Sequence, residues 1–316
     1  MATLPPPKNG ILYLFGAGSH ADKRGTKNPV VQKGRTSKHQ PWFLGIRFVL
    51  LMAAWNGYRV PVGFRIILPK RHAHYRSENA LFREMVDAFV PPRWATLVIV
   101  GGDAADGSKA NMRMVQDRDK ADAARRWGCV FAIARTWKTV EEKTLKNLVT
   151  HVPRKYYQRT RIPREYVGQG SKTFWMYGTC VCVRHVSEVT LVLSKKGRNV
   201  GPQHTTILVT TLAELTPRQV VCIAQKRWAM ELLNWELKSG LGLGRHQVGG
   251  DANRTEKSVG IAVLAYLFVL RPCHHEIIPG KPWSLCQLQH TLRLRVMTNQ
   301  GEHKVKVKMA KTRKVA

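Results

Sequence analysis

Apolar runs in the first third of the chain predict a sheet. A short run at 10–15, ended by glycines, is typical of a buried strand. Two longer runs, 42–55 and 58–68, are rich in β-branched and aromatic residues. They are separated by Asn56-Gly57, the dipeptide that most strongly indicates a hairpin. The chain is therefore predicted to begin with a three-stranded meander.

The next segments alternate between helix and strand. Ser77 opens a predicted helix, and 95–100 is a continuous β run, typical of a strand buried on both faces. Asp103 follows this run, at the carboxyl end of a central strand, where open α/β sheets place their sites. A further helix is predicted from Ser108, followed by a strand at about 128–134.

The pattern changes after Arg135. Helix signals fade up to about Gly201, basic residues are frequent and two runs look like paired strands, so this segment is predicted to be a mostly β, basic insertion. The run 207–211 returns as an apolar strand, and Thr216-Pro217 is a good helix start. A second apolar helix at 259–270 is predicted to be buried. The signals then weaken into a basic tail that we expect to lack regular structure.

The helix predicted at 226–238 combines charged and apolar residues in an uncommon way. Four polar residues, spaced by four, three and four, share a stripe of about 60° on it. They are Arg227, Glu231, Asn234 and Lys238. Most of the remaining circumference is apolar, and only Lys226 and Glu236 are expected to contact water.

A helix that is apolar nearly all round is buried, so the polar stripe is predicted to face an internal cleft. A carboxylate between two cations in a cleft is a candidate for a functional site. The alternative is an ordinary ladder of salt bridges along a helix, because Glu and basic residues pair at these spacings.

The net charge of the chain limits the classes of partner that it is expected to bind. Its 316 residues include 52 Lys and Arg against 20 Asp and Glu, which leaves a formal net charge of +32 spread along the sequence. Such a field favours a polyanion as partner, with a generally basic protein as the alternative. The longest strongly apolar run is too short to span a bilayer, so no membrane partner is predicted, and the N-terminus has no apolar signal region.

The cysteines favour a reducing compartment. The six of them show no disulfide-framework spacing, which fits the cytoplasm. A zinc site is conceivable from a group of residues that lacks the usual close Cys-x-x-Cys spacing. The group is Cys273, His274, His275, Cys286 and His290.

The helix residues resemble a family signature. Arg227, Glu231 and Lys238 match in type and spacing the Tyr-x2-Arg-x3-Glu-x6-Lys signature of DDE transposases of bacterial insertion sequences, in the insertion-sequence-four group. Ala224 stands where that signature has Tyr. The stretch 100–108 looks like the family's block around its second aspartate.

The resemblance covers roughly 11–270 and implies an α/β fold, a ribonuclease-H-like mixed sheet with flanking helices, interrupted by a mostly β insertion. It also implies five segments. These are a leader at 1–10, the first part of the catalytic domain at 11–134, the basic insertion at 135–201, the second part with the Glu231 helix at 202–275, and a C-terminal segment with a basic tail at 276–316.

The resemblance further implies metal-dependent cleavage and strand transfer of DNA at the ends of an insertion sequence. Two Mg²⁺ ions, with Mn²⁺ as substitute, would be held by Asp103 and Glu231 as catalytic ligands. Arg227 and Lys238 would hold the DNA phosphate. The partners would be element-end and target DNA and a second copy of the chain, as a homodimer in a synaptic complex, in the bacterial cytoplasm at the nucleoid.

One position departs from the family. The first catalytic aspartate is expected at the end of the first strand, where this chain has Ala17. Asp22 is five residues further on, in a loop expected at 19–40, where pairing with Lys23 or Arg24 is the simpler reading. An alanine cannot bridge two metals, so we expect this copy to be inactive or severely impaired.

Recognition of DNA raises related questions. Family members carry a DNA-binding region before the first strand, and about ten residues precede it here, which fits a truncated or degenerate element. Trp175 or Trp137 in the insertion would stack on a displaced base, although core packing is the commoner fate of such a Trp. A basic stretch at 154–164, with Tyr156 and Tyr157 interleaved, suits backbone contact or a solvated face. Two other functions stay open, a DNA-binding remnant that inhibits transposition without cutting and a basic RNA-binding protein.

Overall fold

The protein is described by a computed structural model that covers residues 4–23, 28–35, 42–163, 171–243, 251–279 and 281–312. The strands are β1 (Ile11–Asp22), β2 (Gln32–Gly34), β3 (Phe43–Trp55), β4 (Tyr58–Ile67), β5 (Leu97–Gly102), β6 (Arg126–Ala132), β7 (Gln158–Ile162), β8 (Lys172–Val183), β9 (Ser187–Lys195) and β10 (Thr206–Thr210). The helices are α1 (Glu78–Ala88), α2 (Lys109–Ala121), α3 (Leu145–His151), α5 (Pro217–Lys226), α6 (Trp228–Trp235), the π-helical turn η3 (Glu236–Gly240), α7 (Ala252–Leu270) and α8 (Leu285–Thr312). Single 3₁₀ turns are η1 (Arg154–Tyr156), η2 (Pro202–His204) and η4 (His274–Glu276).

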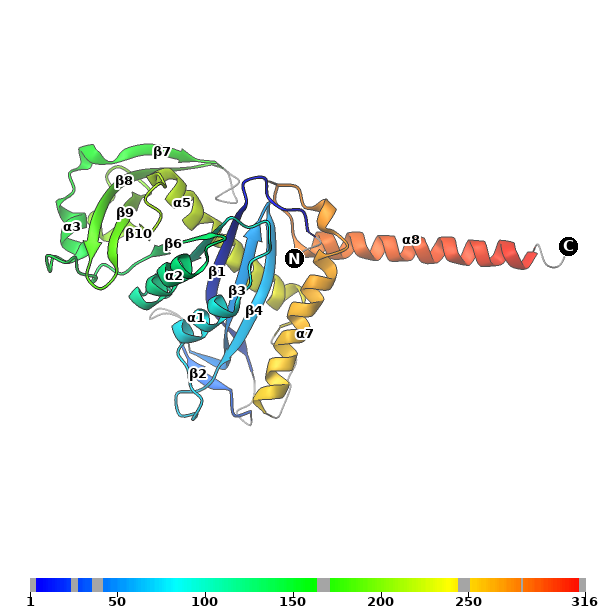
Figure 1. Cartoon of the computed structure of the whole chain (residues 1–316). Coiled ribbons are helices and arrows are strands. Elements are labelled where there is room, and N and C mark those ends of the chain that lie inside the picture. The colour runs from blue at the N-terminus through cyan, green and yellow to red at the C-terminus, as the bar shows by residue number, and fades with distance from the viewer. Residues whose placement is uncertain are drawn as a thin grey trace.

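One sheet runs through the whole molecule (Figure 1). On one side of β1, the strands β3 and β4 continue an antiparallel meander. On the other side, β5 pairs parallel to β1 and β6 pairs parallel to β5. This order and these directions, with α1 and α2 beside the sheet, make the ribonuclease-H-like α/β fold that the sequence implies.

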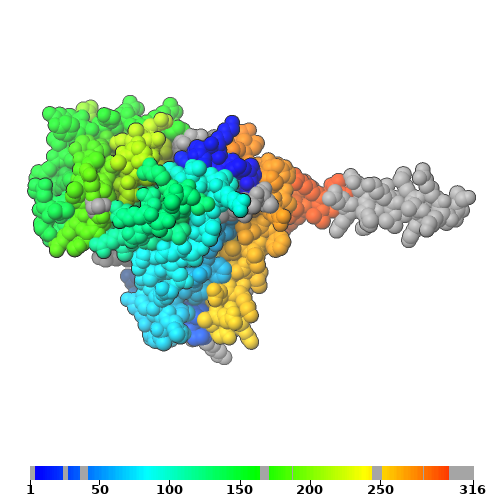
Figure 2. Space-filling view, in the orientation of Figure 1, coloured from blue at the N-terminus to red at the C-terminus, as the bar shows by residue number. Residues whose placement is uncertain are grey.

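The insertion extends this sheet. The strand β10 pairs antiparallel with β6 and with β9, and β8 and β7 follow at the edge. It is mostly β, as predicted, and includes the short helix α3, which the sequence did not indicate. Arg113 of α2 donates a hydrogen bond to the carbonyl of His185 in the β8–β9 turn. The space-filling view shows the green insertion packed against the rest of the body (Figure 2).

Local sequence signals account for several boundaries. Asn56 and Gly57 have φ angles of 45° and 82°, the left-handed pair that a two-residue hairpin turn requires, so the predicted β3–β4 hairpin is confirmed. The side chains of Ser77, Ser108 and Thr216 cap α1, α2 and α5 by accepting hydrogen bonds from backbone N–H groups. These helices begin where the sequence predicted.

A buried ion pair joins the sheet to the C-terminal helices. Arg59 in β4 donates to Glu236 in η3 at 2.7 Å, and their side chains are only 7% and 3% exposed. The Glu236 carboxylate also accepts hydrogen bonds from the Tyr266 hydroxyl at 3.3 Å and the Leu285 N–H at 3.0 Å. The Arg59 guanidinium lies 3.6 Å from the centre of the Trp283 ring. The expectation that Glu236 contacts water was wrong, because β4, α7 and α8 all provide donors to its carboxylate.

The C-terminal helices differ from their predictions. Only one face of α7 is buried, and Ile261, Leu264 and Phe268 are exposed, because the helix covers β4 with a single side. The basic tail was expected to lack regular structure, but α8 continues through it to Thr312 and projects from the body (Figure 1). The described residues include no helix that is long and apolar enough to cross a membrane.

The buried pair generates a stability prediction. Glu236→Gln should lower the free energy of unfolding by about 3–5 kcal/mol in urea titrations, because Arg59 would remain buried without a counter-charge. The matched control is Glu214→Gln in the exposed Arg126–Glu214 pair, which should change the same quantity by about 0–1 kcal/mol. Equal effects of the two substitutions would refute the role given to the buried pair. The double variant Arg59→Met/Glu236→Leu should recover much of the loss.

Candidate functional site

The parallel pairing of β1 with β5 brings Ala17 and Asp103 to the same place, just beyond the last paired residues. Phe15 of β1 pairs with Gly101 of β5. Ala17 follows Phe15 by two residues, and Asp103 follows Gly101 by two residues. A side chain on Gly18 would overlap the Glu78 carboxylate of α1, so the even-numbered positions of β1 face α1. Ala17 therefore faces the opposite side, where α6 contacts β1. The position expected for a first carboxylate holds a methyl group.

Asp103 lies directly after β5 and is exposed. Its Oδ1 accepts hydrogen bonds from the backbone N–H of Ala105 at 2.7 Å and of Asp106 at 3.4 Å, so the side chain stabilises the turn that leads to α2. One oxygen of this carboxylate is thus engaged in the local backbone, as is common for Asp in turns.

Two further carboxylates lie close to Asp103 and were missed by the sequence analysis. Burial, together with the charges of Asp103 and Glu78, raises the pKa of Asp106 to about 8. Burial also raises the pKa of Glu78, against the opposing effect of Arg47, which pairs with it at 2.9 Å. Both carboxylates occupy space left by a glycine on the neighbouring strand, Gly18 for Glu78 and Gly102 for Asp106. Gly18 in β1 and Gly102 in β5 were the sequence signal that could have indicated space for these two side chains.

The helix carrying Glu231 is not buried all round, contrary to the prediction. It packs Met230, Leu233 and Leu237 against the sheet, while Trp228 and Trp235 are each 56% exposed. The sheet covers only one side of α6, so the opposite side faces outward. Glu231 lies on this outward side with 45% of its side chain exposed.

Of the polar stripe, only part faces a common space. Arg227 donates to Glu231 at 3.0 Å, which is the salt-bridge ladder considered as the alternative. Asn234 is instead buried, at 7% exposure. In the described part of the chain, no hydrogen bond or ion pair joins Glu231 directly to Asp103.

Lys238 lies in the π-helical turn η3. Burial lowers its pKa, while the charges of Asp22 and Glu231 act in the opposite direction. Burial and then the charge of Lys238 lower the pKa of His20. Asp22 was expected in a loop, but it is the last residue of β1 and lies 3.7 Å from His20 Nε2. The strand continues further than its apolar run because β3 pairs with it as far as Asp22.

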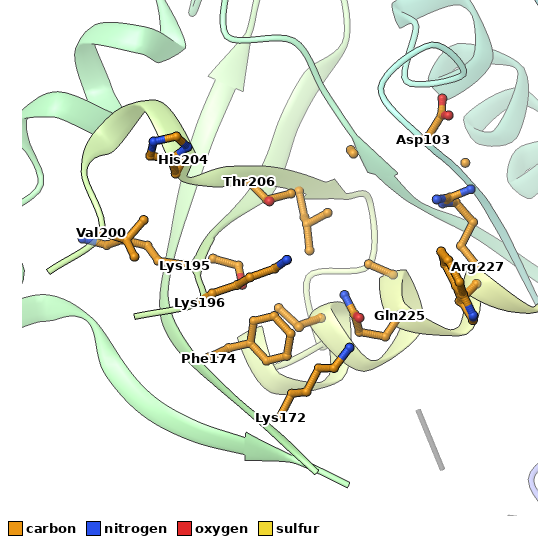
Figure 3. A pocket seen from close by; sticks show the side chains of 17 residues that line it. Asp103, Lys172, Phe174, Lys195, Lys196, Val200, His204, Thr206, Gln225 and Arg227 are labelled. Atoms are coloured by element: carbon orange, nitrogen blue, oxygen red, sulfur yellow. The ribbon is translucent and has the colours of Figure 1, made fainter. Parts of the chain in front are cut away.

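A pocket of about 770 Å³ connects the strand ends with the insertion. Asp103 and Arg227 lie at one end of it, and Lys172 and Lys196 of the insertion lie at the other (Figure 3). Its floor includes Phe174 and other apolar side chains. The pocket is therefore a largely cationic space that opens beside the candidate carboxylate.

The donors present do not assemble a metal site. Within the described ranges, no group of three or more His, Cys, Asp or Glu is placed to hold a metal ion. The group considered as a zinc site from the sequence is therefore not brought together. One of its members, Cys273, is buried, and its thiol donates a hydrogen bond to the Leu288 carbonyl. With Ala17 at the first position and Glu231 paired to Arg227, the arrangement does not fit a two-metal centre.

The two tryptophans of the insertion are both partly buried and pack against the core. Lys109 Nζ lies 5.6 Å from the Trp137 ring centre, and the Arg198 guanidinium lies 5.6 Å from that of Trp175. Neither of them is among the residues that line the pocket.

Comparison with protein-family models gave no match, and comparison with curated proteins gave none either. Among solved structures, the chain is similar to the cryo-EM structure of a piggyBac transposase synaptic complex with hairpin DNA, with a TM-score of 0.48 and 10% sequence identity. The similarity covers 89% of this chain and 51% of that chain, so this chain spans about half the length of that transposase. A likeness of this degree concerns the course of the backbone and not the chemistry.

The contact of Gly18 with Glu78 can be tested by a mutant cycle. Gly18→Ala should lower the free energy of unfolding by roughly 1–3 kcal/mol, because the added methyl group displaces the Glu78 carboxylate. In the Glu78→Ala background the same substitution should cost much less. Gly260→Ala is the control, since its Cβ would meet no atom closer than 3.5 Å and should stabilise α7 by up to about 1 kcal/mol. An equal cost of Gly18→Ala in both backgrounds would refute the contact.

Proposed function

We propose that this chain derives from a DDE transposase of the insertion-sequence-four group and retains a DNA-binding site beside an incomplete catalytic centre. The observation that carries the proposal is the strand-end geometry. Ala17 and Asp103 lie just beyond the parallel pairing of β1 with β5 in a ribonuclease-H-like sheet, and the helix with the Arg227-Glu231-Lys238 spacing packs against β1. The basic charge of +32 supports a nucleic-acid partner.

In this proposal each residue has a defined role. Arg227 and Lys238 bind the phosphate of the DNA strand, the first through its planar fork and the second as a point charge. Asp103 and Glu231 are the two remaining members of a three-carboxylate set, which in the complete form would take Mg²⁺, or Mn²⁺ in its place. A homodimer that joins two element ends belongs to the same proposal.

Ala17 decides the expected activity. Metal-assisted phosphoryl transfer needs ions that stabilise both the attacking and the leaving oxygen, and a methyl group supplies no ligand for them. Glu231 meanwhile is neutralised by Arg227. We therefore infer that the chain binds DNA and cuts it poorly or not at all.

Plasmid nicking tests the loss of activity. The chain as it stands should nick supercoiled DNA no faster in Mg²⁺ or Mn²⁺ than in EDTA, and Ala17→Asp should restore metal-dependent nicking. Ala17→Asn is the matched control, because it has nearly the same size without the charge and should remain inactive. In the Ala17→Asp background, Asp103→Asn and Glu231→Gln should each abolish nicking. Rapid metal-dependent nicking by the unaltered chain would contradict the proposal that this copy is inactive.

A second candidate function is a DNA-binding remnant that occupies element ends and thereby inhibits transposition. Ala17 and the Arg227–Glu231 ion pair favour it, because both reduce the donors available to metal without reducing positive charge. An RNA-binding protein of the same charge is the remaining rival.

Gel shifts separate these functions. The chain should bind element-end DNA in EDTA, and its affinity should fall by roughly 10³-fold or more between 50 mM and 200 mM salt if six or more phosphates are contacted. Structured RNA should compete less well than the same mass of element-end DNA. Preferential displacement by RNA would favour the RNA-binding rival and contradict the transposase origin of the site.

A further inference from the structure

The pocket beside Asp103 is lined by hydrogen-bond donors that come from three separate elements. Lys172 begins β8, Lys196 follows β9, and Gln225 lies in the last turn of α5. Figure 3 shows these three side chains reaching into the same space from different sides. Residues from both the insertion and the core of the fold therefore contribute to one pocket.

These donors have no partners within the protein. In the described part of the chain, no ion pair or hydrogen bond engages the side chains of Lys172, Lys196 or Gln225, and Asp103 is the only carboxylate among the residues that line the pocket. Ser194 also lines the pocket, and the residue as a whole is only 6% exposed.

The sheet explains which side chains face the pocket. A side chain on Gly178 of β8 would overlap Pro217 of α5, so the even-numbered positions of β8 face α5. Ser194 pairs with Met176 and shares that face. Lys195 has the opposite orientation, and its Nζ lies 3.8 Å from the centre of the Tyr157 ring. Ser194 and Lys196 therefore share the face of the sheet that lies toward α5, and Lys195, whose ammonium contacts the Tyr157 ring, also lines the pocket.

We propose that the lysine end of this pocket is a phosphate-binding site, at the opposite end from Asp103 and Arg227. Two ammonium groups, an amide and a hydroxyl are donors suited to the oxygens of a phosphate ester. The apolar floor with Phe174 strengthens such contacts by excluding water. The volume of about 770 Å³ is that of a small-ligand site, so it admits a nucleotide-sized group. The phosphate belongs either to a DNA strand or to a free nucleotide, and the site exists whether or not the chain cuts DNA.

Lysine acetylation with mass-spectrometric readout tests the site in the full-length chain. The probes are thymidine 5′-monophosphate and an eight-residue oligothymidylate, in EDTA and 0.15 M salt to screen weak surface contacts. At a probe concentration ten times its Kd, acetylation of Lys172 and Lys196 should slow about tenfold. Lys70 and Lys257 are exposed and outside the pocket, so their acetylation rates should not change.

Matched variants separate the pocket from the general charge of the protein. Lys172→Gln/Lys196→Gln should weaken probe binding about tenfold or more, as expected for the loss of charged hydrogen bonds. Lys70→Gln/Lys257→Gln removes the same charge and should change binding by less than about twofold.

The outcomes are distinct. Protection by both probes identifies a free-nucleotide site, and protection by the oligonucleotide alone identifies a strand phosphate; either result supports the proposal. Absence of protection at Lys172 and Lys196, or equal protection at Lys70 and Lys257, would overturn it. Because no metal is present, failure here is independent of the nicking assay, and failure of that assay leaves this site intact.

Discussion

The buried Arg59–Glu236 pair fixes the position of the helix on which the candidate site depends. Removing two charges from water is costly, and the additional hydrogen bonds from Tyr266 and Leu285 together with the Trp283 ring offset that cost. Glu236 follows Glu231 by five residues and begins the π-helical turn that contains Lys238. These contacts therefore hold α6 and η3 in place relative to β4, α7 and α8.

The candidate site is a structural framework in which the ligand set is incomplete. The parallel pairing of β1 and β5 places Ala17 beside Asp103, and the chain keeps the cations of the opposing helix. Two acidic groups on the other face of these strands, Glu78 and Asp106, have raised pKa values and do not belong to the expected set. In the proposed function, DNA binding and cutting thus depend on different residues, and the first can be retained after the second is lost.

Much of the fold followed from local sequence, and the site followed only in part. The Asn56-Gly57 turn and the Ser and Thr caps are short-range signals whose chemistry acts within a few residues. Helical periodicity gave the relative angles of Arg227 and Glu231 but not which side of α6 the sheet covers, so the burial of Glu236 and the exposure of Trp228 were reversed. Glu78 was missed because its burial depends on Gly18, which is distant in sequence, and Asp106 was missed although the glycine that makes room for it, Gly102, is only four residues away.

The continuity of the sheet has a mechanical consequence. The strands β9 and β10 are hydrogen-bonded in series with β6 and β5, so the lysine end of the pocket and the Asp103 end are parts of one stiff framework. The width of the gap between them is set by the twist of the strands and not by a hinge between two bodies. A ligand that spans the gap must adjust its own conformation. In the proposed site, the protein would therefore select ligands whose phosphates have a spacing that matches this fixed distance.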